Sequence, residues 1–349
     1  MTLKGNYNFH HASASHAAEN QGFSAYQSPS KDENRYYEFH KPVLLKEMLE
    51  NLSPKNGEIY IDGTFGAGGY SAAILESANC KIYAFDRDET VNKFAEPLKK
   101  RFPDNFIFVN SPFSQMREKM AELGIAKVDG IVLDLGVSSM QLDCAERGFS
   151  FNSDHKLDMR MDIKQGISAF EIVNQMSEVE LKEIIKNFGE ENRSTQIAKK
   201  IVLARQKKEI TTALELANIV RSAYGHKKTG KIDPATKTFQ AIRIAVNDEL
   251  QELRTALMSA KALLSKNGRL VVVSFHSLED SYVKSFLRAE SGYNSNLSRY
   301  NPLLFLEEQK KEASDFILKH SGTIKPSDEE LENNVRSRSA RLRAAIKVN

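Results

Sequence analysis

The stretch 61–75, with the sequence IDGTFGAGGYSAAIL, constrains the fold more than any other part of the chain. It begins with a short apolar run that ends at Asp62, continues through four closely spaced glycines, and then carries small and apolar residues at helical spacing. This order predicts a strand, a glycine-rich turn and the start of a helix. Nucleotides, dinucleotides and sulfonium cofactors can all bind at such a turn, so the glycines alone leave the ligand open.

Further short apolar stretches alternate with helix-length stretches along the chain. We predict strands within 57–62, 80–88, 106–113, 128–139 and 268–280. Because parallel strands buried on both faces read as continuous apolar runs, this alternation favours a parallel, doubly wound sheet. The predicted fold class is therefore α/β, with a Rossmann-like sheet.

Helical signals dominate between the fourth and fifth predicted strands. Ser177 with Glu180, and Thr212 with Glu215, form two capping boxes ahead of apolar helical stripes. One further helix is expected from about Thr238 to 267–268. The predicted organisation is a disordered tail over 1–36, an α/β domain over 37–142 plus 247–349, and an inserted all-helical substrate-recognition domain over 143–246.

The composition limits the classes of protein to which the chain can belong. Hydrophobic residues make up 41% and charged residues 27%, which is near the average for folded soluble proteins. No apolar run approaches the roughly 20 residues that span a bilayer. The two cysteines, Cys80 and Cys144, are too few for a disulfide framework and too far apart for a metal knuckle. We therefore expect a cytoplasmic protein without a metal site and without membrane association.

Acidic residues at the ends of three predicted strands narrow the choice of ligand. A dinucleotide turn has a third glycine where Ser71 stands here, and Asp62 just before the turn would repel a pyrophosphate but attract an ammonium group. Asp86 ends the second strand, where a carboxylate can accept bonds from ribose hydroxyls, and Asp134 ends the fourth strand at the same crevice. These carboxylates favour S-adenosylmethionine over NAD, although Asp at a strand end can also cap the next helix.

Several long motifs now make the chain recognisable, and they span about Phe39 to Ala344. They include HKPVLLKEMLENL, YIDGTFGAGGYS, DGIVLDLGVSSMQLDCAERGFSF, PATKTFQAIRIAVNDEL, GRLVVVSFHSLED and RSRSARLRA. With these motifs the chain resembles the RsmH/MraW family, S-adenosylmethionine-dependent methyltransferases that modify N4 of a cytidine in the decoding (P-site) region of 16S ribosomal RNA. The resemblance implies a class I methyltransferase sheet, S-adenosylmethionine as cofactor, and 16S rRNA or the small ribosomal subunit as partner.

The resemblance also implies roles for individual residues. Glycines of the turn and Tyr70 would line the methionine end of the cofactor, Asp86 would hold the ribose, and Phe113 would contact the adenine. The chain departs from the family pattern at three positions, with Tyr70 in place of His, Met140 in place of Pro, and Val335 in place of Pro. The full set of predicted cofactor-binding residues is Asp62, Gly66, Gly68, Gly69, Tyr70, Asp86, Phe113, Asp134 and Gln141.

Transfer to a cytosine amino group would require an acceptor for the N4 hydrogens, since the N4 lone pair is delocalised into the ring. Ser138 and Ser139 follow the fourth strand and His276 follows the fifth, so we predict these three as catalytic contacts. Local helix capping by the serines and a structural hydrogen bond by the histidine are the alternatives. Phe149 and Phe151 could stack on a base or pack in a core. Neither cysteine follows proline, which argues against covalent attack on cytosine.

Positive charge gathers in two segments, 226–231 and 335–347, although the net charge is only +3. Such clusters can neutralise RNA phosphates. A nicotinamide dehydrogenase and a non-catalytic RNA-binding factor remain alternatives, and the oligomeric state stays open, a homodimer included. The predicted phosphate-binding residues are Lys227, Lys228, Lys237, Arg243, Arg336, Arg338, Arg341 and Arg343.

Overall fold

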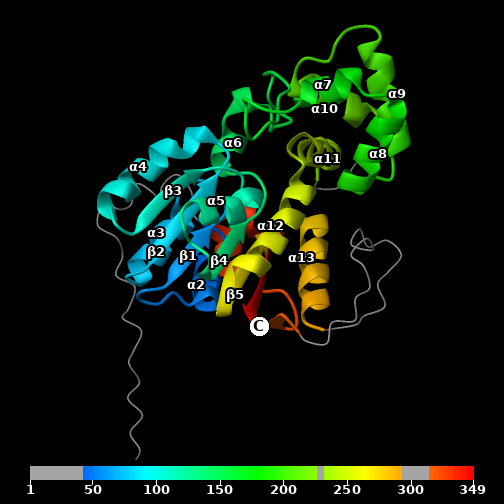
Figure 1. Cartoon of the computed structure of the whole chain (residues 1–349). Coiled ribbons are helices and arrows are strands. Elements are labelled where there is room, and N and C mark those ends of the chain that lie inside the picture. The colour runs from blue at the N-terminus through cyan, green and yellow to red at the C-terminus, as the bar shows by residue number, and fades with distance from the viewer. Residues whose placement is uncertain (1–41, 226–231, 293–313) are drawn as a thin grey trace, which may run out of the picture. The chain divides into compact units, whose positions relative to one another are not determined.

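The computed structural model describes residues 42–225, 232–292 and 314–349 (Figure 1). The predicted tail over 1–36 lies outside the described residues, and so do Lys227 and Lys228. The described residues all belong to one compact unit by their contacts.

The core of the described chain is one seven-stranded sheet with the strand order β3-β2-β1-β4-β5-β7-β6. Strands β1 to β5 are parallel, while β7 runs antiparallel to both β5 and β6. This arrangement confirms the predicted α/β fold with a Rossmann-like sheet. The strands are β1 (Ile59–Asp62), β2 (Lys81–Asp86), β3 (Phe106–Asn110), β4 (Val128–Asp134), β5 (Leu264–Ser274), β6 (Phe316–Leu318) and β7 (Arg341–Lys347).

Successive side chains on a strand point to opposite faces of the sheet, and helices bury both faces. Tyr60 belongs to one hydrophobic cluster and Ile61 to the other, and Val132 and Leu133 divide in the same way. Helices α2 (Leu45–Leu52), α3 (Gly69–Ser77) and α4 (Asn92–Arg101) contribute to the first cluster. Helices α5 (Met116–Glu122), α12 (Glu249–Leu263) and α13 (Ser277–Glu290) contribute to the second, and α12 and α13 lie side by side (Figure 1).

A helical segment separates β4 from β5, and it has a hydrophobic cluster of its own. The predicted capping boxes of Ser177 with Glu180 and of Thr212 with Glu215 are both present. Figure 1 shows α7 to α10 gathered in one group, with α11 continuing into α12. The helices are α6 (Ser139–Asp143), α7 (Ala169–Gln175), α8 (Glu178–Gly189), α9 (Ser194–Arg205), α10 (Ala213–Ser222) and α11 (Ala235–Asn247).

The prediction of a single helix from about 238 to 267 is wrong. The structure has two helices there, α11 and α12, which are divided at Asp248. Asp248 has a φ of 49°, a left-handed conformation that Asp tolerates better than most residues. As a result Phe239 of α11 packs in the helical cluster, whereas Leu257 of α12 packs against the sheet. Helix α12 ends at Leu263, earlier than predicted, and β5 begins directly after it.

The remaining elements are short. Within the residues described, no helix is long and apolar enough to cross a membrane. The short elements are α14 (Asp328–Asn333) and the 3-10 helices η1 (Glu89–Val91), η2 (Phe113–Gln115), η3 (Ala145–Arg147) and η5 (Val335–Ser339).

Candidate functional site

A cavity of about 270 Å³ lies at the carboxyl ends of β1, β2 and β4. In a doubly wound sheet the strand order reverses beside the first strand, and ligands bind at this point. Glycine-turn residues, the segment after β4 and the start of η2 form its wall. Residues that line it include Gly66, Gly69, Tyr70, Asp86, Phe113, Asp134, Ser138, Gln141, Arg243 and Arg336. The structure therefore brings most of the predicted cofactor residues together.

The glycine turn requires glycine at two positions for different reasons. Gly68 has a φ of 82°, and a Cβ there would lie 2.8 Å from the ring of Phe65. A Cβ on Gly69 would lie 2.3 Å from Cγ of Pro42. Gly68 itself does not line the cavity, so it shapes the turn, whereas Gly69 forms part of the wall.

Asp62 is not among the residues that line the cavity, and its carboxyl group is occupied by contacts within the protein. Its side chain is fully buried, with Oδ2 accepting from Ser71 Oγ at 2.7 Å and Oδ1 accepting from the Thr64 N–H at 3.1 Å. Ser71 is the residue that broke the dinucleotide pattern, and on the first turn of α3 it lies within reach of β1. Burial raises the pKa of Asp62 to about 6.

Asp86 both lines the cavity and holds the turn that forms it. Its Oδ2 accepts from the Gly66 N–H at 2.9 Å, and its Oδ1 accepts from the Asp88 N–H at 2.9 Å. Asp86 therefore holds the backbone of the glycine turn and of its own strand end, and it does not cap the following 3-10 helix, which Asp88 caps through the Thr90 N–H. Burial raises the pKa of Asp86 to about 6, so a ligand that donates hydrogen bonds would favour the charged form.

Asp134 has a buried oxygen, Oδ1, with no hydrogen-bond partner among the described residues. The carboxyl group lines the cavity, and burial, followed by the charges of Asp62 and Glu279, raises its pKa well above the ordinary value. Buried polar atoms in proteins nearly always have partners. An acceptor left unpaired in a cavity wall therefore fits a ligand that brings a donor or a positive charge.

The other predicted cofactor residues have partners that fix their positions. Tyr70 is buried, and its hydroxyl donates to the carbonyl oxygen of Val43. Gln141 donates from Nε2 to Asp88 Oδ2 at 3.0 Å and accepts from the Ser138 N–H at 3.1 Å. Tyr70, which stands where the family has histidine, is therefore hydrogen-bonded to the segment ahead of α2.

The predicted catalytic residues fall in different places. Ser138 lines the cavity, but its Oγ caps α6 by accepting from the Gln141 N–H at 3.2 Å. The side chain of Ser139 lies outside the described part of the structure. His276 does not line this cavity, because it caps α13 through Nδ1, which accepts from the Glu279 N–H at 3.4 Å. His276 lines a neighbouring cavity instead, which shares Phe275 with the cofactor cavity.

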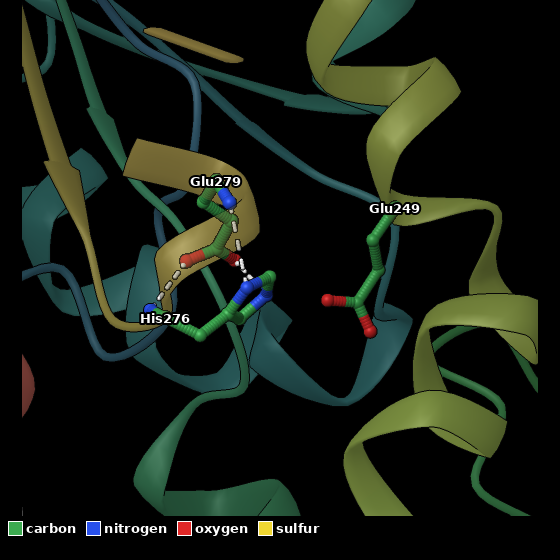
Figure 2. A group of neighbouring side chains, drawn as sticks. All are labelled: Glu249, His276 and Glu279. Atoms are coloured by element: carbon green, nitrogen blue, oxygen red, sulfur yellow. Dashed lines mark hydrogen bonds and ion pairs between the residues drawn. The ribbon is translucent and has the colours of Figure 1, made fainter. Parts of the chain in front are cut away.

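Sequence reasoning missed a cluster around His276, which Figure 2 shows with Glu249 and Glu279. One ligand-type atom from each of the three residues lies within 4.8 Å of the others. Both oxygens of Glu249, however, accept from the guanidinium of Arg243 at 2.8 Å. Burial alone would raise the pKa of Glu279, but His276 and then Arg243 hold it below the ordinary value. Arg243 therefore already neutralises Glu249, and His276 is the partner of Glu279. The three-residue spacing of His276 and Glu279, which is that of a capping box, was the only sequence signal of this cluster.

Most of the predicted phosphate-binding residues are already paired with acceptors. Arg343 forms a two-bond contact with Asp280, at 2.7 and 3.1 Å, and its side chain is only 14% exposed. Arg341 shares Asp280 at 3.0 Å, and Arg336 pairs with Asp143 at 2.6 Å. Lys237 donates to the carbonyl of Glu190 and Arg243 pairs with Glu249. Arg338 is exposed and has no partner among the described residues.

The aromatic pair in the segment after α6 packs into the helical cluster. Phe149 is buried there, and Phe151 makes an edge contact with Phe239 at a ring distance of 5.8 Å. Core packing is thus the role that the structure gives both rings.

The parallel sheet with antiparallel β7, the glycine turn and the acidic cavity at the carboxyl edge define a class I methyltransferase. The chain belongs to the MraW methylase family, whose model matches residues 37–348. The cofactor of this methyltransferase is S-adenosylmethionine. The paired carboxylate of Asp86 and the unpaired oxygen of Asp134 fit its hydroxyl and cationic groups.

Two close relatives carry the same name. "Ribosomal RNA small subunit methyltransferase H" of Orientia tsutsugamushi (strain Ikeda) is 50% identical over 320 residues, covering 89% of this chain and 98% of that protein. The protein of the same name from Rickettsia canadensis (strain McKiel) is 52% identical over 309 residues, with 88% and 97% covered. The solved structure of an rRNA methylase from Streptococcus thermophilus matches 87% of this chain and 94% of its own. Its sequence identity of 9% and its TM-score of 0.38 are too low to support an inference about this chain.

Proposed function

We propose that the protein transfers a methyl group from S-adenosylmethionine to the N4 amino group of a cytidine in the decoding region of 16S ribosomal RNA. The names of the relatives support ribosomal RNA of the small subunit as the substrate. The observation that carries the choice of an amino group is the chemistry of the cavity wall, which offers acceptors and, among its described residues, no thiol and no lysine.

A thiolate is needed to activate cytosine for methylation at carbon 5. Cys80 is buried in the hydrophobic cluster beneath the sheet, Cys144 is exposed, and neither lines the cavity. A ribose hydroxyl would favour a basic side chain such as lysine close to it. An exocyclic amine needs only acceptors for its hydrogens, and this is the requirement that the wall meets.

When bound, the cofactor supplies a methyl group made electrophilic by the positive sulfur. The amine nitrogen must lie about 3 Å from the methyl carbon and opposite the sulfur, so alignment supplies much of the rate. Transfer to the amine would convert the cofactor to S-adenosylhomocysteine and would release one N4 proton, which needs an acceptor on the protein. The protein aligns the reactants through Asp86 at the ribose and through Tyr70 and Phe113 in the wall.

The acceptors for the N4 proton are those predicted after β4, namely Ser138, Ser139 and the backbone carbonyls of that turn. Ser138 lines the cavity, and although its Oγ caps α6, a hydroxyl oxygen has a second lone pair to offer. The helical segment over 143–246 is proposed as the substrate-recognition domain. It reaches the cavity through Met161 and Arg243, and this contact supports the assignment.

Labelled cofactor and small-subunit ribosomal RNA from a strain that lacks the activity test the proposal. After digestion to nucleosides, the label should appear as N4-methylcytidine. The same product should form with the variant in which Cys80 and Cys144 are both replaced by Ala. Label on carbon 5 or on ribose, or loss of activity in a folded double variant, would contradict transfer to the amine.

A further inference from the structure

A second cavity, of about 280 Å³, adjoins the cofactor cavity and shares the side chain of Phe275 with it. Its wall is built from three separate parts of the chain. These are the loop between β5 and α13, the segment ahead of α14 with Lys325, and the junction of η5 with β7, which carries Arg338 and Arg341.

This second cavity is positively charged. No carboxylate is among the described residues that line it. Lys325 and Arg338 are exposed and have no partner among the described residues, and the side chain of Arg341 keeps 45% of its surface exposed while sharing Asp280. The neighbouring helix α14 is acidic, but it contributes Leu331 to the wall and directs Glu330 to the Leu44 N–H.

A third cavity, which adjoins the cofactor cavity at Arg87 and Pro112, is lined by as many carboxylates as cations. Arg87 pairs with Glu252 at 2.7 Å and Lys164 pairs with Glu89 at 2.6 Å. Its two other cations are paired as well, Lys119 with Glu122 and Arg160 with Asp158. Bound phosphate gains most from cations that no carboxylate already neutralises. Of the two neighbouring cavities, the one beyond Phe275 is therefore the one suited to a phosphate.

We propose that the cavity bounded by Phe275, Lys325, Arg338 and Arg341 binds a phosphodiester of the RNA strand next to the target nucleotide. The inference rests on the proposed function, since a strand that places one base in the cofactor cavity must leave across its rim. Phosphate contacts position a strand without reading its sequence. This cavity therefore fixes the register of the strand while the cofactor cavity receives the base.

The matched variants are Lys325→Ala with Arg338→Ala, and Lys266→Ala as control. Lys266 is also exposed and has no partner among the described residues, but it lies at the opposite end of β5. There Leu264 pairs with Val128, about 20 Å by the rise of a strand from Asp134 at the other end of β4. The double variant should bind small-subunit RNA about tenfold more weakly than the wild type does. Its dependence of log affinity on log salt should flatten by about 0.7 for each lost contact to a single strand.

Two readouts separate the possible failures. Affinity for S-adenosylhomocysteine, measured by calorimetry, should be equal in all three proteins, and a loss in the double variant would place these cations at the cofactor and overturn the inference. RNA affinity of the double variant equal to that of the Lys266→Ala control would overturn it as well. A wild-type protein that forms no N4-methylcytidine would instead overturn the proposed function itself.

The position of the phosphate is tested with neutral methylphosphonate linkages, introduced one at a time by ligation into small-subunit RNA around the target cytidine. In the wild type, one linkage beside the target should cost about as much affinity as the double substitution. In the double variant the same linkage should cost nothing, because residues and groups in contact give non-additive losses. Additive losses at every linkage, or a sensitive linkage remote from the target, would overturn the assignment.

Discussion

Replacing Asp62 by Asn should stabilise the ligand-free protein at pH 8, although Asp62 is fully buried in the middle of the glycine-turn motif. Burial raises the pKa of this carboxyl group from 3.8 to about 6. A carboxyl group with a raised folded-state pKa contributes stability below its unfolded pKa, and this contribution is lost as pH rises through the folded pKa. The loss therefore occurs between about pH 4 and pH 6.

The size of the effect follows from the pKa difference. At about 1.4 kcal/mol for each pKa unit, the charged carboxylate costs up to about 3 kcal/mol of unfolding free energy at pH 8. An Asn side chain removes this cost and keeps both contacts. Its oxygen can accept from the Thr64 N–H, and its amide can donate to Ser71 Oγ, which also has acceptor capacity.

Urea unfolding of the wild type and the Asp62→Asn variant, at several pH values, measures the prediction. The variant should be more stable at pH 8, and the difference should shrink from about pH 6 downward until the two proteins converge below about pH 4. Calorimetry with S-adenosylhomocysteine should give similar affinities, because Asp62 does not line the cavity. A variant that is less stable at pH 8, or that loses more than about tenfold in cofactor affinity, would refute this account of Asp62.

Two further predictions concern packing and charge. Gly69→Ala should lower the unfolding free energy by about 1–3 kcal/mol, because the added Cβ would lie 2.3 Å from the ring of Pro42. Gly322→Ala is the control, since the space around its Cβ is open. Equal melting curves for the two variants would contradict the clash. Arg343→Ala should destabilise the fold by about 1–3 kcal/mol, since Asp280 loses the partner with which it forms two bonds. Arg338→Ala should leave thermal unfolding unchanged. If Arg338→Ala destabilised the protein more than Arg343→Ala does, the ion pair would have no structural role.

The sequence by itself determined the five parallel strands of the sheet, the glycine turn and the position of the cavity, but not the antiparallel strands β6 and β7. These features depend on local signals, since buried parallel strands are apolar runs and the carboxyl ends of such strands meet at one edge. Asp86 and Asp134 could be placed at the cavity because each ends a strand. The capping box of Ser177 with Glu180 is local in the same sense, as its two partners are three residues apart.

Only the tertiary structure decided how individual side chains are used. Asp62 and Asp134 both end strands, yet Ser71 binds the first away from the cavity while an oxygen of the second stays unpaired in its wall. The basic segment near the C-terminus proved to contain β7, where Asp280 neutralises Arg343 from 63 residues away. A sequence displays every charge but not its partner, because ion pairs and burial arise from contacts between residues that are distant along the chain. The unpaired cations Lys325 and Arg338 could be told from the paired ones only in the folded protein.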